Sequence, residues 1–310
     1  MCALRISLFG KLHIRSGDQT LTHLNAHRAQ ELLCYLLLHR DRPHPRETLA
    51  GLLWNECSTA QSKKYLRKAL WQIQTVLETQ SDSPASRVLL VDADWIEINP
   101  QAELWLDVTV FEQTFNSVQG VPGKELDRQC AQSLQSAVDL YRGDLLEGWY
   151  LDWCLYERER LQNLYLAMLD KLMDYFEAHQ EYAAGLACGS LILRYDRARE
   201  RTHRRLMRLY YLANDRTAAL RQYERCIACL SEELGVEPAK RTVALYEQIR
   251  ADRLERPNST HPAVIQAKPQ VATSVLVETL DRLKQVQVIL ADTCNQVQQN
   301  IQAMEIFLNR

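Results

Sequence analysis

The hydrophobic pattern of this 310-residue chain changes near residue 107. Up to that point, short stretches that alternate between apolar and polar residues flank three segments with a helical period. From residue 107 to 254 the apolar residues recur at helical spacing alone, without a strand signal. We therefore predict a mainly α-helical protein with a small β component and at least two domains, for which the chain is long enough.

Before this change, the order of the elements is strands, three helices and a hairpin. Alternation over residues 4–14 and 19–24 predicts a small sheet, and "VLLVDADWIEINP" at 88–100 predicts two strands joined at 92–94. This order is typical of a winged helix-turn-helix, in which the third helix enters the DNA major groove and the hairpin lies beside the backbone. We predict such a DNA-binding domain over residues 1–106.

Capping signals predict where each of the three helices begins. Asn25 suits the N-cap of the first helix, and Pro45 suits the first turn of the second. The second helix has an expected apolar face of Leu49, Leu52, Leu53 and Trp54. The third helix is expected over about 60–79. Its alternative caps are Ser58, Thr59 and Ser62.

The third predicted helix has an apolar face and a basic face. Its inward positions share a helical period and are Leu66, Ala69, Leu70, Ile73, Val76 and Leu77. At about 100° per residue, the opposite face gathers Lys64, Arg67, Lys68 and Trp71, with Lys63 at its shoulder. Because the formal net charge of the whole chain is only -2, these cations are a local concentration.

Two interpretations of this basic face are open. A cation-rich helix face is often merely solvated. However, Glu78 is the only acidic residue of this helix, so ion pairs within the helix do not explain the cations. Trp71 on the same face is also typical of a contact surface. We therefore predict that the face binds DNA.

Residues 107–255 are expected to form a second, helical domain. Two of its segments superpose at an offset of about 35 residues, which is close to the period of tetratricopeptide repeats. The matching residues are Leu172, Tyr175 and Ala178 in the first segment and Met207, Tyr210 and Ala213 in the second. Such helix pairs bury their apolar faces by stacking into a curved array. An unrelated helical bundle is the alternative.

The last part of the chain separates into a linker and a helix. Residues 256–270 contain three prolines and few apolar residues, which predicts a linker. Residues 271–310 carry a 4-3 repeat that predicts a coiled-coil or oligomerisation helix, in which Gln287 fixes the register or the number of strands. The repeat consists of Leu276, Leu280, Leu283, Gln287, Leu290, Cys294, Val297, Ile301, Met304 and Leu308. A helix that folds back on the repeat domain is the alternative.

Several classes of function lack their motifs in this sequence. Cys226 and Cys229 are the only close cysteine pair, and no second pair of metal ligands lies at suitable spacing, so no metal or other cofactor is expected. "GVPGKE" lacks the spacing of a phosphate-binding loop, and the common hydrolase motifs are missing, so no enzyme is expected. Without a long apolar run or a secretory signal, the protein is expected to be cytoplasmic and to have no membrane partner.

Four stretches of the sequence, in this order, resemble the SARP family of bacterial transcriptional activators. They are "AHRAQELLCYLLLHRDRPHPRETLAGLLW", "YLRKALWQIQTVL", "LYRGDLLEGWYLDWCLYERERLQNLYLAMLDKL" and "RTAALRQYERCIACLSEELGVEP". The resemblance spans residues 4–250 and leaves the last part of the chain outside it. It implies a winged helix joined to a bacterial transcriptional activator domain of the tetratricopeptide type.

The resemblance also implies how the protein works. It implies binding to short direct repeats in double-stranded DNA at promoters and recruitment of RNA polymerase, usually by adjacent copies, so that a homo-oligomer is expected. Carried over by position, Lys64, Arg67 and Lys68 belong to the recognition helix, and Arg28 lies near a phosphate. Trp71 and Tyr65 depart from the small polar residues common in the family, so the family's base preferences do not transfer.

The partner of the helical array stays open: it is polymerase, a neighbouring protomer or a signalling protein. The alternative to the whole activator interpretation is an adaptor of a signalling complex that does not bind DNA at all. The acidic and aromatic stretch at 142–161, with Trp149, Tyr150, Trp153 and Tyr156, forms either a binding surface or, as we expect, the packed joint between two domains.

Overall fold

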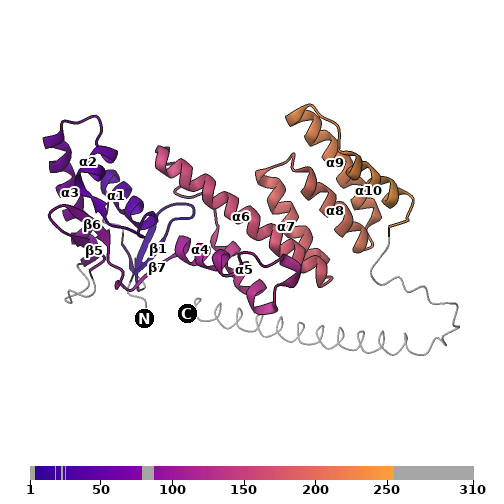
Figure 1. Ribbon diagram of the computed structural model, residues 1–310, viewed down its shortest axis with the longest axis horizontal. Coiled ribbons are helices and arrows are strands. Elements are labelled where there is room, and N and C mark those ends of the chain that lie inside the picture. Colours follow the sequence, from indigo (N-terminus) through magenta and orange to yellow (C-terminus); the bar gives the residue numbers. More distant parts are fainter. Residues whose placement is uncertain (1–3, 18, 22–23, 25, 79–86, 255–310) are drawn as a thin grey trace, which may run out of the picture. The chain divides into compact units, whose positions relative to one another are not determined.

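The computed structural model describes residues 4–17, 19–21, 24, 26–78 and 87–254. Residues 1–254 belong to one compact unit. The predicted linker at 256–270 and the predicted coiled coil at 271–310, with all of its repeat residues, lie outside the described residues. Most of the described chain is helical, and the strands are confined to the N-terminal part, as predicted (Figure 1).

The chain begins with the small sheet that its alternating pattern predicts. Its strands are β1 (Leu4–Ser7), β2 (His13–Ser16), β3 (Gln19–Thr20) and β7 (Leu104–Leu106), in the order β3-β2-β1-β7. β1 pairs antiparallel with β2 but parallel with β7. β7 was not predicted, because its partner lies about a hundred residues away and its own three residues carry little signal.

Three helices follow in the predicted order: α1 (His27–Leu38), α2 (Arg46–Leu53) and α3 (Thr59–Glu78). The prediction of Asn25 as the N-cap of α1 is wrong. Ala26 occupies that position in an extended conformation and makes no side-chain cap. In the first turn, the Glu31 carboxylate pairs with the side chains of His27 and Arg28.

The predicted apolar face of α2 is only partly buried. Leu49 and Leu53 are buried in the core, whereas Leu52 is 41% exposed. α3 begins at Thr59, and Ser62 is buried in its first turn. The Ser62 hydroxyl donates to the carbonyl of Trp54 at 3.0 Å, which fixes the turn between α2 and α3.

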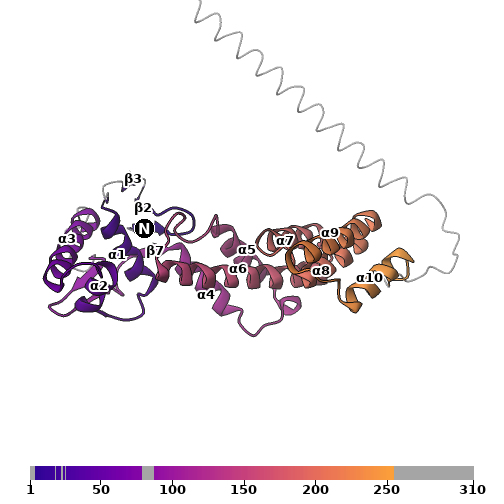
Figure 2. The same cartoon turned by 90° about the horizontal axis from the view of Figure 1, so that it is seen from above.

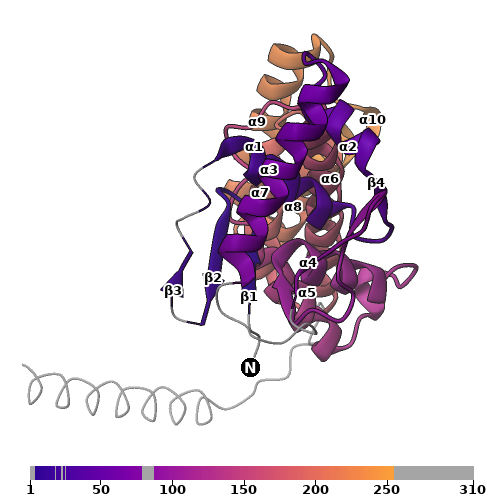
Figure 3. The ribbon, with the colours of Figure 1, turned by 90° about the vertical axis from the view of Figure 1, so that its left-hand side faces the viewer.

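The predicted hairpin is the next described element after α3. It consists of β5 (Leu89–Val91) and β6 (Trp95–Ile98), and the short β4 (His44–Pro45) pairs with β6 to complete a second sheet in the order β4-β6-β5. Arg46 ties the hairpin tip to the start of α2, because its backbone N–H donates to the Asp94 carbonyl and its Nη1 donates to the Asp92 carbonyl. Figure 3 shows α3 lying across the helices of this region, with the β1–β2 sheet at its side.

Helices make up the rest of the described chain. They are α4 (Asp107–Ser117), η2 (Gly123–Glu125), α5 (Arg128–Leu140), α6 (Asp152–Ala178), α7 (Tyr182–Tyr195), α8 (Glu200–Leu212), α9 (Arg216–Leu234) and α10 (Lys240–Arg250). Helices α6 to α9 succeed one another as packed neighbours (Figures 1 and 2). None of the helices in the described ranges is long and apolar enough to span a membrane.

The turns between these helices repeat the same backbone geometry. Gln180, between α6 and α7, and Asn214, between α8 and α9, both have a positive φ, of 60° and 67°. In each turn the next residue donates its N–H back five positions, from Glu181 to Phe176 and from Asp215 to Tyr210. Such matched turns support the predicted repeat, because they give each helix pair the same reversal.

Asp107 joins the N-terminal sheet to the helical region. Its buried carboxylate accepts hydrogen bonds from the backbone N–H groups of Leu8, Phe9 and Val108, at 2.8 to 3.0 Å. Burial raises the pKa of Asp107, although these N–H groups act in the opposite direction. The β1–β2 loop continues the joint, because Gly10 exchanges backbone hydrogen bonds with the segment at 144–147.

The stretch at 142–161 divides between packing and exposure. Both tryptophans pack against rings of α1. The distance between ring centroids is 5.2 Å from Trp149 to His27 and 5.5 Å from Trp153 to Tyr35. The expectation of a packed joint is therefore confirmed for the two tryptophans. In contrast, Tyr150 is 80% exposed.

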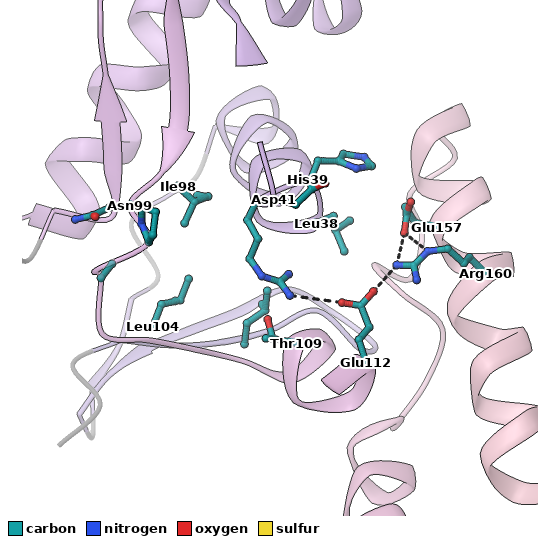
Figure 4. A pocket seen from close by; sticks show the side chains of 14 residues that line it. Leu38, His39, Asp41, Ile98, Asn99, Leu104, Thr109, Glu112, Glu157 and Arg160 are labelled. Carbon is teal, nitrogen blue, oxygen red and sulfur yellow. Dashed lines mark hydrogen bonds and ion pairs between the residues drawn. The ribbon is translucent and has the colours of Figure 1, made fainter. Parts of the chain in front are cut away.

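An ionic network crosses the same joint (Figure 4). Glu112 of α4 forms an ion pair with each of two arginines, one at each carboxylate oxygen. They are Arg40, which follows α1, and Arg160 of α6. Arg160 also binds Glu157 at 2.7 Å. The network borders a cavity of about 630 Å³ and links three helical segments of the compact unit.

Candidate nucleic-acid interface

The two faces of α3 separate as the helical period predicts. Five of its six predicted inward residues are buried, and the sixth, Val76, is half-buried. The buried residues pack into the core that α1 and α2 share. Because one side of the helix is fixed in this way, its other side must face outward.

All five residues predicted for the outward face of α3 are exposed, namely Lys63, Lys64, Arg67, Lys68 and Trp71. Trp71 is 65% exposed, which is unusual for so large an apolar side chain. The neighbouring Tyr65 is 41% exposed and lies near Trp54, with 6.4 Å between the ring centroids. We use the name recognition face for these five residues.

The cations of the recognition face differ in whether they have a partner. Lys63 binds Glu47 of α2, with 2.6 Å between Nζ and Oε1. This hydrogen bond, together with the lysine's charge, lowers the pKa of Glu47. Lys64, Arg67 and Lys68 form no ion pair with any residue that the structure describes. Three positive charges are thus left open to solvent.

A groove of about 640 Å³ lies between α3, the start of α2 and the hairpin. Lys63 and Arg67 line one side, Glu47 lies at the start of α2, and Trp95 of the hairpin lines the other side. Trp95 is 47% exposed. It was missed among the site residues, although the alternation of β6, which buries Ile96 and Ile98, could have placed it outward.

The hairpin tip carries acidic rather than basic residues. Asp92 and Asp94 flank the turn, and Asp94 also lines the groove. Carboxylates at this position would repel a DNA backbone that came close to the tip. Glu47 and this acidic tip limit the positive surface to the outward side of α3, and neither effect was evident from the sequence of α3 alone.

Arg28, the remaining predicted DNA-binding residue, belongs to α1 and makes its described contact there. Its Nη1 binds the Glu31 carboxylate at 2.7 Å, while its side chain is 52% exposed. The adjacent His27 ring packs against Trp149. A phosphate would therefore have to compete with Glu31 for this guanidinium, and the predicted role of Arg28 stays a prediction.

The arrangement fits binding of polyanions better than chemistry on a substrate. Solvent-exposed lysines and arginines on one helix can neutralise phosphates, and an arginine on that helix can pair with a guanine edge. Among the residues that the structure describes, no group of three potential metal ligands comes together.

Comparisons with known proteins identify the helical region. Residues 106–250 match the family "Bacterial transcriptional activator domain". This match begins at the residue before α4 and ends with α10. It therefore covers all the helices from α4 to α10.

Curated relatives match over most of the chain. Transcriptional regulatory protein MoaR1 of Mycobacterium tuberculosis is 24% identical over 268 residues, which cover 80% of this chain and 79% of MoaR1. Regulatory protein AfsR of Streptomyces coelicolor is 26% identical over 255 residues, which cover 80% of this chain but 24% of AfsR. Both relatives are named as regulators.

A solved structure has the same fold. Mycobacterium tuberculosis EmbR, determined in complex with a low affinity phosphopeptide, matches with a TM-score of 0.62 and 19% identity. The match covers 82% of this chain and 66% of the EmbR chain. Residues 106–250 thus carry a bacterial transcriptional activator domain, and these similarities together support a place for the chain among SARP-family transcriptional regulators.

Proposed function

We propose that this protein activates transcription by binding double-stranded DNA through the recognition face of α3. The observation that carries the proposal is the set of three cations, Lys64, Arg67 and Lys68, exposed without a described counter-ion on a helix whose other side is buried. A rigid helix that leaves unpaired cations in water is suited to a major groove, because it brings phosphate contacts and base contacts together.

Each residue of the recognition face has its own proposed role. Arg67, near the middle of the face, pairs with a guanine edge and supplies sequence preference. Lys64 and Lys68 contact phosphates, and Lys63 does so only after it leaves Glu47. Trp71 contributes apolar contact to a sugar or to a thymine methyl group.

The proposed DNA-binding domain is residues 1–106, and the proposed activator domain is residues 107–255. The proposed DNA target is direct repeats in promoters, and the proposed partner of the activator domain is RNA polymerase. The proposed location is the cytoplasm. A protein partner finds a candidate surface at the start of α6, where Leu155, Tyr150 and Tyr156 are exposed. A signalling protein is the alternative occupant of this surface.

Selection of bound duplexes from a random pool, followed by titration of the selected duplex, tests the proposal. We expect saturable binding of the full chain and a selected motif with repeated half-sites. A matched control replaces Arg221 and Arg225, two exposed arginines of α9, by Ala and should bind like the wild type. If no motif emerges and binding to duplex DNA does not depend on salt, the adaptor function replaces the activator function.

We also propose that residues 271–310 mediate oligomerisation, which would place two recognition faces on adjacent repeats. Light scattering of the full chain and of a variant that ends at residue 270 tests this part separately. The truncated variant should contain fewer chains per particle than the full-length protein. Its molar mass should therefore fall by more than the mass of the deleted residues. An unchanged oligomeric state would remove the coiled coil from the proposal and leave DNA binding in place.

A further inference from the structure

A second group of cations lies on the outer face of the N-terminal sheet. None of its members belongs to α3. This face borders a cavity of about 750 Å³. Its floor is formed by side chains from all four strands, and its wall comes from the segment between α5 and α6. The cationic residues of the cavity are Arg5, Lys11, Arg15 and Arg142, and His13 also lines it.

The strand register places the floor residues in rows. Arg5 of β1 lies opposite Arg15 of β2 and beside Trp105 of β7, and Arg15 lies opposite Thr20 of β3. One row thus crosses the sheet as Trp105, Arg5, Arg15 and Thr20. The next row pairs Ser7 with His13. The inward residues between them, such as Ile6 and Ile14, are buried in the core.

Two arginines directly opposite each other on paired strands repel each other and weaken the sheet. Neither Arg5 nor Arg15, nor Lys11 or Arg142, forms an ion pair with a carboxylate in the described part of the chain. Arg5 is held instead over the Trp105 ring, with its Cζ 3.9 Å from the ring centroid. Such an arrangement orders one guanidinium without neutralising it.

The acidic groups near this cavity do not cancel its charge. Asp107 lines it, but its carboxylate is buried and already accepts the N–H groups of Leu8, Phe9 and Val108. Glu147 is an exposed carboxylate at the wall and makes no ion pair with a described residue. Among the described residues that line the cavity, four cations therefore face one free carboxylate.

We infer that this cavity is an anion site that takes a small molecule with two or more linked phosphate groups. The four cations come from the floor, the β1–β2 loop and the α5–α6 segment, so a single phosphate group cannot satisfy them all. Guanidinium groups bind phosphate oxygens in pairs, which suits Arg5 and Arg15 as the floor of such a site. The cavity volume lies within the usual range for small-ligand sites.

A small ligand suits this cavity better than duplex DNA. The floor and the wall at 140–147 line one cavity that suits a compact ligand, whereas a duplex is a convex rod that meets exposed ridges such as α3. The ligand would bridge the N-terminal sheet and the segment that leads into α6. Its binding therefore stabilises the joint between these two parts of the compact unit.

Calorimetric titration of the full chain with inorganic pyrophosphate tests the site, with orthophosphate and a nucleoside triphosphate as parallel ligands. We expect one saturable pyrophosphate site and affinity at least about tenfold weaker for orthophosphate, since fewer charged hydrogen bonds form. Pyrophosphate should also raise the midpoint of thermal unfolding. Inorganic triphosphate is the control for the nucleoside triphosphate, because both carry three phosphate groups. Tighter binding of the nucleotide than of inorganic triphosphate then requires contacts to its nucleoside.

Variants at the floor and at the wall locate the binding. Combined Arg5→Gln and Arg15→Gln changes, and separately Arg142→Gln, should each weaken pyrophosphate binding about tenfold or more. Arg142→Gln lies outside the sheet and keeps the test valid if the floor variant unfolds. Matched Arg221→Gln and Arg225→Gln changes in α9 should leave the affinity unchanged.

Two results would overturn the inference. One is the absence of saturable pyrophosphate binding, or binding that the floor and wall variants leave unchanged. The other is loss of duplex DNA binding in those variants without any pyrophosphate site, which would make the sheet part of the DNA interface. An Arg67→Ala variant separates the two proposals, since it should lose DNA preference and keep pyrophosphate binding.

Discussion

The cations of α3 and those at the contact between α6 and the start of α8 are arranged in opposite ways. In the repeat region, Asp170 of α6 binds Arg205 of α8 and Arg199, the residue before that helix, and Arg205 also binds Asp174. Arg208 binds Glu177 in the same manner, at 2.9 Å. On α3, only Lys63 has an acidic partner among the described residues, and that partner, Glu47, is itself exposed.

This difference separates structural charge from functional charge. Arg205 is 12% exposed and links two helices that are distant in sequence, so its charge is balanced within the fold. On the recognition face, Lys64, Arg67 and Lys68 make no ion pair with a described residue. Exposed cations without a stabilising contact among the described residues are candidates for binding a partner, because the stability of the fold does not account for them.

Loss of a paired cation should have the largest effect. Arg205→Ala removes the partner of Asp174 and one of the two partners of Asp170, and leaves partly buried carboxylates behind. We expect a loss of about 2 to 3 kcal/mol in the free energy of unfolding, measured by chemical denaturation. A loss below about 0.5 kcal/mol, the usual range for a surface site, would show that these pairs are not structural.

The recognition face should show its largest effect in binding rather than in stability. Arg67→Ala should cost about 1 to 3 kcal/mol of discrimination at one base pair of the selected duplex, since a bidentate contact to guanine is lost. Affinity measured for the selected duplex and for single base-pair variants of it gives this value. Unchanged preference at every position would assign Arg67 to phosphate contact instead.

Glu47→Ala removes the partner of Lys63, so it should strengthen DNA binding where Arg67→Ala should weaken it. The variant gains a free cation on the recognition face and loses a nearby carboxylate, so duplex affinity should rise at low salt, and the gain should shrink as salt is added. Fluorescence anisotropy with a labelled duplex measures the change. Weaker binding by the variant would place Glu47 itself in contact with DNA.

The smallest effect is expected for the stability of a Lys64→Ala variant. Because Lys64 has no ion pair with the described residues, its removal should change the free energy of unfolding by less than about 0.5 kcal/mol. Denaturation in parallel with Arg205→Ala makes the contrast direct. A loss comparable to that of Arg205→Ala would mean that Lys64 is structural and would break the comparison.

The sequence was informative where the signal is local. The inward stripe and the outward cations of α3 follow from the helical period, and the hairpin follows from alternation around residues 92–94. The repeat in the helical region likewise rests on residues within one or two helices. These elements were therefore predicted with their approximate bounds.

Contacts between distant residues were beyond these local signals. The parallel pairing of β1 with β7 and the hydrogen bonds from Leu8 and Phe9 to Asp107 join residues about a hundred positions apart. The Lys63–Glu47 pair also depends on how α2 packs against α3. Asn25 was a reasonable cap by composition, but the chain enters α1 one residue later, at Ala26.

Salt dependence of duplex binding tests the central claim most directly. If Lys64, Arg67 and Lys68 meet phosphates or bases as free cations, the logarithm of the association constant should fall linearly with the logarithm of salt concentration, with a slope of about -3 or steeper. The Lys64→Ala variant should reduce the magnitude of that slope by about 1. A wild-type slope near zero, or a slope that all three alanine variants leave unchanged, would contradict the assignment of α3 as the DNA-binding element.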